Sequence, residues 1–345
     1  YTLWHTLSLH DALPISSNAA LSKSSHKETG RFMKMQMVAL VLLLLFARMP
    51  AQTQIILDAD TANEMDDFYA IVAALLDTNL HVTALISAHF NNTHLVTDSV
   101  WHNYPTKDIN TVQLSQTENL KLLNSLNIAI PHPIGCDRMV GYFWGYYPGA
   151  PIPESPGVDT IIAAAQNASP TEKLNIVCLG AVTNVAAAIL TEPGIAKNIR
   201  LYALNMKYDF DKQAWNKNSF NARVDVNALD VVLNHRDLEL FIMPGTVARE
   251  LVFERQTTLA KLGNLSHPTA RILEERWDQV NAGDTWIMWD VALVEAIAHP
   301  DFATRETFTT PPENTHRSIN AYSDIDAEQM KENVWRKLET LDSSE

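Results

Sequence analysis

The chain has 345 residues, of which 26 are Lys or Arg and 40 are Asp or Glu, so its formal net charge is −14 with histidine neutral. This excess of negative charge argues against binding to nucleic acid or to an anionic membrane, because both need clustered positive charge. The composition, 46% hydrophobic and 19% charged, is that of a globular protein, and two cysteines, Cys136 and Cys178, are too few for a disulfide-built scaffold.

The first 51 residues have the features of leader segments. Residues 1–16 resemble translated sequencing-adapter read-through, and we treat residues 1–32 as a non-native or untranslated leader. Residues 33–51 combine a basic residue, an apolar run over 38–47 and a small residue at a cleavage site near Ala51, as secretory signal peptides do. The apolar run is shorter than the ~20 residues that span a bilayer, although an uncleaved anchor and a buried strand remain alternatives. We expect a secreted or periplasmic protein with no membrane span in the mature chain.

From residue 54 onward, short β-rich runs alternate with helical patterns, which predicts an α/β fold. We expect a Rossmann-like, mostly parallel sheet with helices on both faces, in a single domain over 52–345. Such sheets place their sites beyond the carboxyl ends of the strands. The predicted strands are 54–60, 81–88, 174–180, 199–204 and 238–243, and the predicted helices are 66–77, 158–167, 184–190, 226–235, 266–281 and 290–298.

Two stretches, 91–110 and 138–156, interrupt the alternation of strands and helices. The second is rich in Gly, Pro and aromatic residues and has neither a helical nor a strand period. It is therefore predicted to be a long loop, either a lid over the site or a packed surface loop.

Five acidic residues crowd the end of the first predicted strand and the start of the next helix: Asp58, Asp60, Glu64, Asp66 and Asp67. One or two would be explained by capping of the helix N-terminus. Five carboxylates repel one another unless a cation neutralises them, and oxygen ligands suit Ca²⁺ or Mg²⁺. The cluster therefore predicts a metal site.

Three known kinds of site could account for this cluster. An EF-hand loop beginning at Asp58 would need Gly and Glu where the chain has Asn63 and Tyr69, so it is excluded. A haloacid-dehalogenase phosphatase fits poorly, because Ala62 replaces that family's Thr or Val. The third is the nucleoside hydrolase family, whose first strand ends in Asp-X-Asp and is followed by an Asp pair at the head of a helix. The run from Asp58 to Asp67 resembles this pattern, with the longer gap of a divergent branch.

Further blocks that resemble the same family follow in the same order along the chain. They are the strand-to-helix turn at Thr183 and Asn184, the Ser219-Phe220-Asn221 block with Asp225 after it, and Trp289-Asp290 at the start of the last predicted core helix; Asn91 matches less firmly. The resemblance extends over nearly everything after residue 54.

The resemblance implies calcium-dependent hydrolysis of ribonucleosides. It assigns Ca²⁺ to Asp60, Asp67, Asp290 and the backbone carbonyl of Thr183, with Asp60 also accepting the proton of the attacking water. It implies a small-molecule ribonucleoside as the partner and leaves a homo-oligomer open. It assigns the ribose to Asn221 and, less firmly, Asn91, with Asn216 or Asn218 nearby; Trp289 is a further substrate-binding candidate from its own chemistry.

Two positions depart from the family pattern. Ser219 stands where many members have a Glu that grips the 5′ end of the sugar, and Trp289 stands where several have a His that could protonate the base. Tryptophan cannot act as a general acid but can stack on a purine, and Trp144, Tyr146 and Trp215 are candidates for a common aromatic wall. Trp289 can equally pack in the core. The alternative function is a riboside-binding protein that retains the calcium-ribose pocket without turnover.

Overall fold

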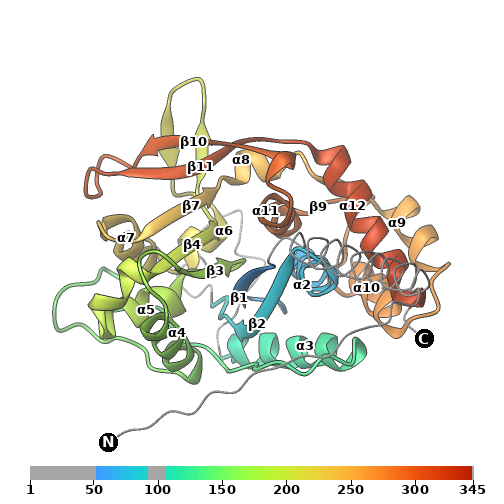
Figure 1. Ribbon diagram of the computed structural model, residues 1–345, viewed down its shortest axis with the longest axis horizontal. Helices are drawn as coiled ribbons and strands as arrows, with labels where there is room; N and C mark the ends of the chain where they lie inside the picture. Colours follow the sequence, from blue (N-terminus) through green and yellow to red (C-terminus); the bar gives the residue numbers. More distant parts are fainter. Residues whose placement is uncertain (1–51, 92–105, 107, 344–345) are drawn as a thin grey trace, which may run out of the picture. The chain divides into compact units, whose positions relative to one another are not determined.

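The computed structural model describes residues 52–91, 106 and 108–343 (Figure 1). Its centre is a seven-stranded sheet in the order β10-β11-β7-β4-β3-β1-β2, in which the only antiparallel pair is β10 with β11. The prediction of a mostly parallel sheet is therefore confirmed. The strands are β1 (Thr53–Ala59), β2 (Leu80–Ser87), β3 (Leu174–Cys178), β4 (Ile199–Leu204), β7 (Glu239–Met243), β10 (Ala303–Thr309) and β11 (Ser318–Ile325).

Alternating side chains of the strands supply two separate cores, one on each face of the sheet. In β1, Ile55 and Leu57 belong to one buried cluster and Ile56 to the other, as expected for successive residues that point to opposite faces. On the first face the cluster is completed mainly by α2 (Asp66–Leu76), α3 (Thr111–Ser125), α10 (Pro268–Gln279), α11 (Trp289–Ala298) and α12 (Ala327–Glu339). On the second face it is completed by α4 (Pro156–Asn167), α5 (Thr183–Thr191) and α7 (Val226–Asn234) (Figure 1).

Several elements were not anticipated from the sequence. Helix α3 begins directly after the interrupted stretch 91–110, with Asn110 as its N-cap, and its polar sequence carries only a weak apolar period. Neither β10 nor β11 was predicted. Strand β10 exposes most of its side chains, so it lacks the apolar pattern of the buried strands, and in β11 polar residues alternate irregularly with the buried ones. The other additions are the hairpins β5 (Lys207–Asp209) with β6 (Ala214–Asn216) and β8 (Val252–Glu254) with β9 (Thr285–Ile287), the helices α6 (Phe220–Val224), α8 (Gly245–Ala248), α9 (Arg255–Leu262) and α12, and the 3₁₀ turns η2 (Pro193–Asn198), η3 (Pro300–Phe302) and η4 (Thr340–Ser343).

The loop predicted over 138–156 contains neither helix nor strand as far as Ser155, and its last predicted residue, Pro156, begins α4. It is tied to α7, because the side chain of Asp225 accepts a hydrogen bond from Val140 N at 2.9 Å and Asn227 Nδ2 donates to the carbonyl of Val140 at 2.7 Å. Phe143, Trp144 and Tyr147 are exposed, with Trp144 74% exposed and stacked on Tyr142, whereas Tyr146 is half-buried and packs against the second core.

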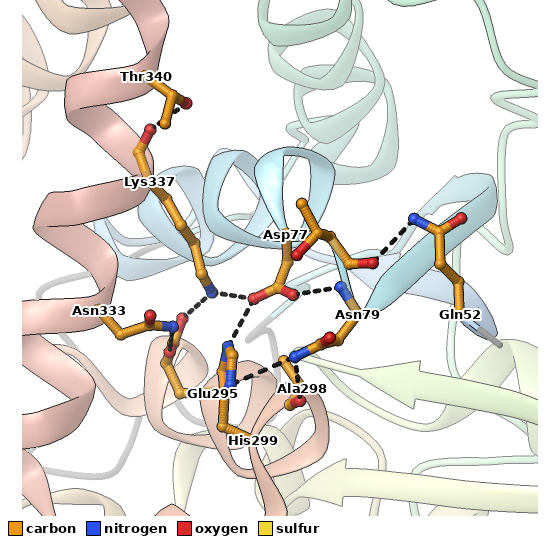
Figure 2. Close-up of polar contacts among 10 residues, drawn as sticks. Gln52, Asp77, Asn79, Glu295, Ala298, His299, Asn333, Lys337 and Thr340 are labelled. Atoms are coloured by element: carbon orange, nitrogen blue, oxygen red, sulfur yellow. Dashed lines mark hydrogen bonds and ion pairs between the residues drawn. The ribbon is translucent and has the colours of Figure 1, made fainter. Parts of the chain in front are cut away.

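A buried polar network joins the end of α2 to α11 and α12 (Figure 2). The ammonium of Lys337 forms ion pairs with both Asp77 and Glu295, and His299 Nε2 lies 2.9 Å from Asp77 Oδ2. Asn333 Nδ2 donates to the other oxygen of Glu295 at 2.8 Å. Burial alone would raise the pKa of Asp77, but hydrogen bonds from His299 and Lys337 and the charge of Lys337 outweigh it and lower that pKa to about 2.

Within the described part of the chain, no helix is both long and apolar enough to cross a membrane. The predicted leader and signal segments, and most of 91–110, lie outside the described residues.

Candidate active site

A pocket of about 240 Å³ opens at the carboxyl ends of β1, β3 and β4, where a parallel sheet is expected to place its site. The strand ends are completed by the first turns of α2, α6, α8 and α11. The lining residues are Asp60, Asn63, Glu64, Asp66, Asp67, Leu179, Leu204, Asn205, Met206, Lys207, Ser219, Phe220, Asn221, Gly245, Trp289 and Asp290.

Four buried aspartates gather on one side of the pocket. Carboxylate oxygens of Asp66, Asp67 and Asp290 lie within 4.8 Å of one another, and Asp60 lines the same pocket. Each of the four keeps one buried carboxylate oxygen without a hydrogen-bond partner: Oδ2 of Asp60 and Oδ1 of the other three. Buried carboxylate oxygens are normally satisfied. Their orphaned state and hard-oxygen chemistry fit a divalent cation.

The pKa shifts of these carboxyl groups also fit a cation site. Burial, followed by repulsion from neighbouring carboxylates, raises the pKa of Asp67 and Asp290 well above its usual range. The same two effects raise the pKa of Asp60 and bring that of Glu64 to about 8. A cation among these oxygens would reverse the shifts, because it favours the charged carboxylates.

Arg276 holds the acidic loop from outside the pocket. Its guanidinium donates to the carbonyls of Ala62, at 2.8 Å, and Glu64, at 2.9 Å, and its charged carbon lies 4.6 Å from the centre of the Phe68 ring. The loop between Asp60 and Asp66, which is longer than in the family pattern that the sequence resembles, is thus held in place by an arginine of α10. Sequence reasoning did not identify Arg276, because it lies far along the chain.

Asp60 is positioned by the end of β3. A Cβ atom at Gly180 would lie 2.6 Å from Asp60 Oδ1, so only glycine lets the two segments approach so closely. Asp58, in contrast, serves the framework: its Oδ1 accepts a hydrogen bond from Asn184 Nδ2 at 2.8 Å, and burial raises its pKa to about 7.

The structure brings some of the predicted site residues together and leaves others apart. Asp60, Asp67, Asn221, Trp289 and Asp290 line the pocket. Asn221 bridges two strand ends, since its Nδ2 donates to the carbonyls of Leu179 and Leu204 at 2.5 and 3.1 Å.

Thr183, Asn91 and Asn218 are not among the lining residues. The Thr183 hydroxyl donates to Asp225 Oδ2 at 2.8 Å, Asn91 Oδ1 accepts from Thr106, and Asn218 is exposed and accepts from Arg223. The candidates for an aromatic wall, Trp144, Tyr146 and Trp215, do not line the pocket either. Trp144 stacks on the exposed loop and the Trp215 indole donates to the Thr309 carbonyl, so each is used elsewhere.

Asn205, Met206 and Lys207 line the pocket directly after β4, and sequence reasoning missed them. The signal that could have found them is the rule already applied to β1, that polar residues following a parallel strand face the site.

Comparison with protein families decides the family. The model of the family described as inosine-uridine preferring nucleoside hydrolase matches residues 55–332. The chain belongs to this nucleoside hydrolase family. Comparison with curated protein sequences gives no significant match.

Solved structures of nucleoside hydrolases share the fold. An inosine-guanosine nucleoside hydrolase superposes with a TM-score of 0.62 at 17% identity, covering 84% of this chain and 99% of its own. A purine-preferring ribonucleoside hydrolase from Gardnerella vaginalis gives 0.60 at 15% identity, with coverages of 84% and 99%. An inosine-uridine preferring nucleoside hydrolase from Bacillus anthracis gives 0.59 at 12%, with coverages of 83% and 99%.

Both departures of this nucleoside hydrolase from the family pattern lie in the pocket. Ser219 lines it, and its hydroxyl is buried without a hydrogen-bond partner. Trp289 is half-buried, lines the pocket and also packs against the core. Trp289 therefore takes part in both the pocket and the core, the two roles that the sequence left open for it.

Proposed function

We propose that the chain is a calcium-dependent N-glycosidase that cleaves ribonucleosides to ribose and free base. One observation carries the proposal: four buried aspartates line one side of a pocket, and each keeps a carboxylate oxygen without a partner. Membership of the nucleoside hydrolase family supports the reaction. Calcium suits the site because it takes six to eight oxygen ligands in flexible geometry.

Asp60, Asp67 and Asp290 would hold the ion, with Asp66 beside them and the Thr183 carbonyl as a further proposed ligand. Bound calcium supplies attachment for the 2′ and 3′ hydroxyls of ribose and lowers the pKa of a water molecule.

Asp60 is the proposed general base. Its carboxylate lines the pocket beside the other aspartates and has an oxygen free of protein partners, so it can accept the proton of the attacking water. The carboxylates around it also favour the positive charge that develops on the ribosyl ring as the glycosidic bond breaks. Asn221, fixed between the ends of β3 and β4, positions the sugar.

Few protein groups are placed to assist the departure of the base. Among the described residues, no histidine lines the pocket, whereas Trp289 does. We therefore assign Trp289 to stacking on the base, which favours purines through their larger ring face, with solvent as the source of the proton. This lack of a histidine acid is also what favours the second candidate, a riboside-binding protein without turnover.

A panel of ribosides distinguishes the two functions. Inosine, guanosine, adenosine, uridine, cytidine and p-nitrophenyl riboside are scored for base release in Ca²⁺ and again in EDTA, with binding measured in parallel by calorimetry. Release in Ca²⁺ that EDTA abolishes supports the hydrolase. Binding without release supports the second candidate, and absence of both excludes a riboside site. 2′-Deoxyinosine is the matched control, because a site built for a hydroxyl rejects a substrate that lacks it.

A further inference from the structure

The side of the pocket at β4 carries hydrogen-bond donors with no protein acceptor. Asn205 is 2% exposed, and its Oδ1 accepts a hydrogen bond from Met206 N at 2.9 Å. That bond fixes the orientation of the amide, and its Nδ2 has no partner. A buried N–H group without an acceptor destabilises the fold, so a ligand atom that accepts this hydrogen bond would bind favourably there.

The turn that presents this amide is itself held in an uncommon conformation. Met206 has φ = 55°, in the left-handed region that non-glycine residues seldom adopt. Its carbonyl accepts a hydrogen bond from Gly245 N at 2.9 Å, and Asn205 N donates to the Met243 carbonyl at 3.2 Å. The ends of β4 and β7 therefore hold the strained turn, and backbone strain of this kind concentrates at functional sites.

Two more donors lie beside Asn205 in the lining. The Ser219 hydroxyl is buried and has no partner, and Lys207 is the one cationic side chain that lines the pocket in the described part of the chain. No ion pair or hydrogen bond of the Lys207 ammonium occurs among the described residues. Its neighbours differ: Lys212 pairs with Asp209 at 2.8 Å, and Lys217 pairs with Asp230 at 2.7 Å.

The donors and the aspartates lie on different strands of one sheet. β3 separates β1 from β4, and strands are about 4.8 Å apart, so the two ends of the pocket are roughly 10 Å from each other. That span is comparable with a ribose ring extended by a substituent on its 5′ carbon. Asn221 lies between them, bonded to the ends of β3 and β4.

We propose that Asn205, Lys207 and Ser219 bind an anionic group on the 5′ carbon of the sugar, so that the substrates include 5′-phosphorylated ribosides. This inference rests on the proposed function for the sugar and base. A phosphate offers several acceptor oxygens to an amide, a hydroxyl and an ammonium, whereas an unmodified 5′-hydroxyl offers a single oxygen. The five carboxylates lining the pocket would repel such an anion, so binding requires a cation among them.

Binding of ribose 5-phosphate and of ribose to the full chain in Ca²⁺, measured by calorimetry, tests the assignment without any turnover. Ribose 5-phosphate is expected to bind at least tenfold more tightly, and Lys207→Ala to remove most of that preference. Lys212→Ala is the matched control, because it removes an exposed, ion-paired lysine of the same hairpin and should keep the preference. High salt should weaken the preference in the wild type, since the charges are accessible to solvent.

Equal binding of the two sugars, or equal loss of both in Lys207→Ala, would overturn the anion site. Turnover separates this inference from the proposed function. Cleavage of inosine without cleavage of inosine 5′-phosphate would support the hydrolase and reject the anion site. Preference for ribose 5-phosphate without any base release would support the anion site and reject the hydrolase. Inosine 5′-carboxylate distinguishes phosphate from carboxylate: equal acceptance would reject phosphate as the specific group.

Discussion

The backbone N–H of Asp290 donates a hydrogen bond to the Asp66 carboxylate, with 3.1 Å between Asp290 N and Asp66 Oδ2. The bond joins the first turns of α2 and α11, which are separated by 224 positions along the chain. It uses one oxygen of Asp66 and leaves the other, Oδ1, unpaired beside the unpaired oxygens of Asp67 and Asp290. A backbone hydrogen bond therefore holds like charges close together, an arrangement that a cation bound among them would stabilise.

Loss of one carboxylate should abolish metal binding and leave the fold. Asp290→Asn and Asp60→Asn keep side-chain volume but remove a negative charge, so we expect base release to fall at least 100-fold and calcium affinity to drop. Calorimetric Ca²⁺ titration and circular dichroism check the two halves of this expectation. Asp324→Asn, at an exposed position of β11, is the control. Unchanged calcium affinity in either site variant would show the ligand assignment to be wrong.

Calcium should stabilise the protein, and more so at higher pH. A ligand at 100 times its Kd contributes about 2.7 kcal/mol, which for a domain of this size raises the Tm by roughly 5 °C. The pKa values of Glu64, Asp67 and Asp290 are raised in the metal-free folded protein, so this form loses stability as the pH rises above the pKa values of the same groups in the unfolded chain. At low pH, protons compete with the ion for the carboxylates. Thermal melts at pH 5.5 and 8 with EDTA or Ca²⁺ measure this. A shift of equal size in Asp290→Asn would place the ion elsewhere.

The buried network of Figure 2 should contribute strongly to stability. Lys337→Met leaves the carboxylates of Asp77 and Glu295 buried without their cation, and breaking such a pair costs about 3–5 kcal/mol. Urea denaturation of the variant checks this. Lys331→Met, on the same helix, removes a surface pair with Glu328 and should cost under about 1 kcal/mol.

A pH dependence identifies the electrostatic part of that cost. The folded-state pKa of Asp77 is lowered from 3.8 to about 2, so its contribution is complete above pH 4 and is lost as pH falls toward 2. In Lys337→Met the loss of stability between pH 4 and 2 should be shallower than in the wild type. Parallel slopes would mean that Lys337 acts through packing of its methylene groups.

Five strands of the sheet, β1, β2, β3, β4 and β7, were predicted because each has an apolar pattern that its own residues specify. The aspartates of the pocket could be found because they directly follow β1 or begin a predicted helix, positions that a parallel sheet places at its site. Arg276 and Lys207 could not be found, because their roles depend on which distant segment lies beside them. Strand β10 was missed because its exposed residues leave no apolar pattern at the sheet edge. Trp289 could be assigned neither to pocket nor to core, because it contacts both.

Export is a prediction of the sequence that concerns residues outside the described part. Expression with the leader intact should give a product in the periplasm or medium that begins near Gln52, since a signal peptidase cuts after a small residue such as Ala51. Intact-mass analysis of the recovered protein measures the start. A membrane-bound product that retains residues 38–47 would identify an anchor instead.

The leaving base gives the last prediction. Trp289 begins α11 directly before the buried Asp290, and it lines the pocket. If stacking on the base replaces protonation by a side chain, Trp289→Ala should lower kcat/KM for inosine by about tenfold or more. It should affect p-nitrophenyl riboside much less, because that leaving group departs without a proton.

The core contact of Trp289 predicts some loss of stability in the same variant, so Trp289→Phe is needed beside it. Phenylalanine retains an aromatic face and part of the core contact and should recover much of the inosine turnover. The ratio of the two kcat/KM values is the decisive measurement, because a general loss of folded protein lowers both and leaves their ratio unchanged. A constant ratio with a lowered Tm would assign Trp289 to packing alone, and activation of the base would then have to come from another residue.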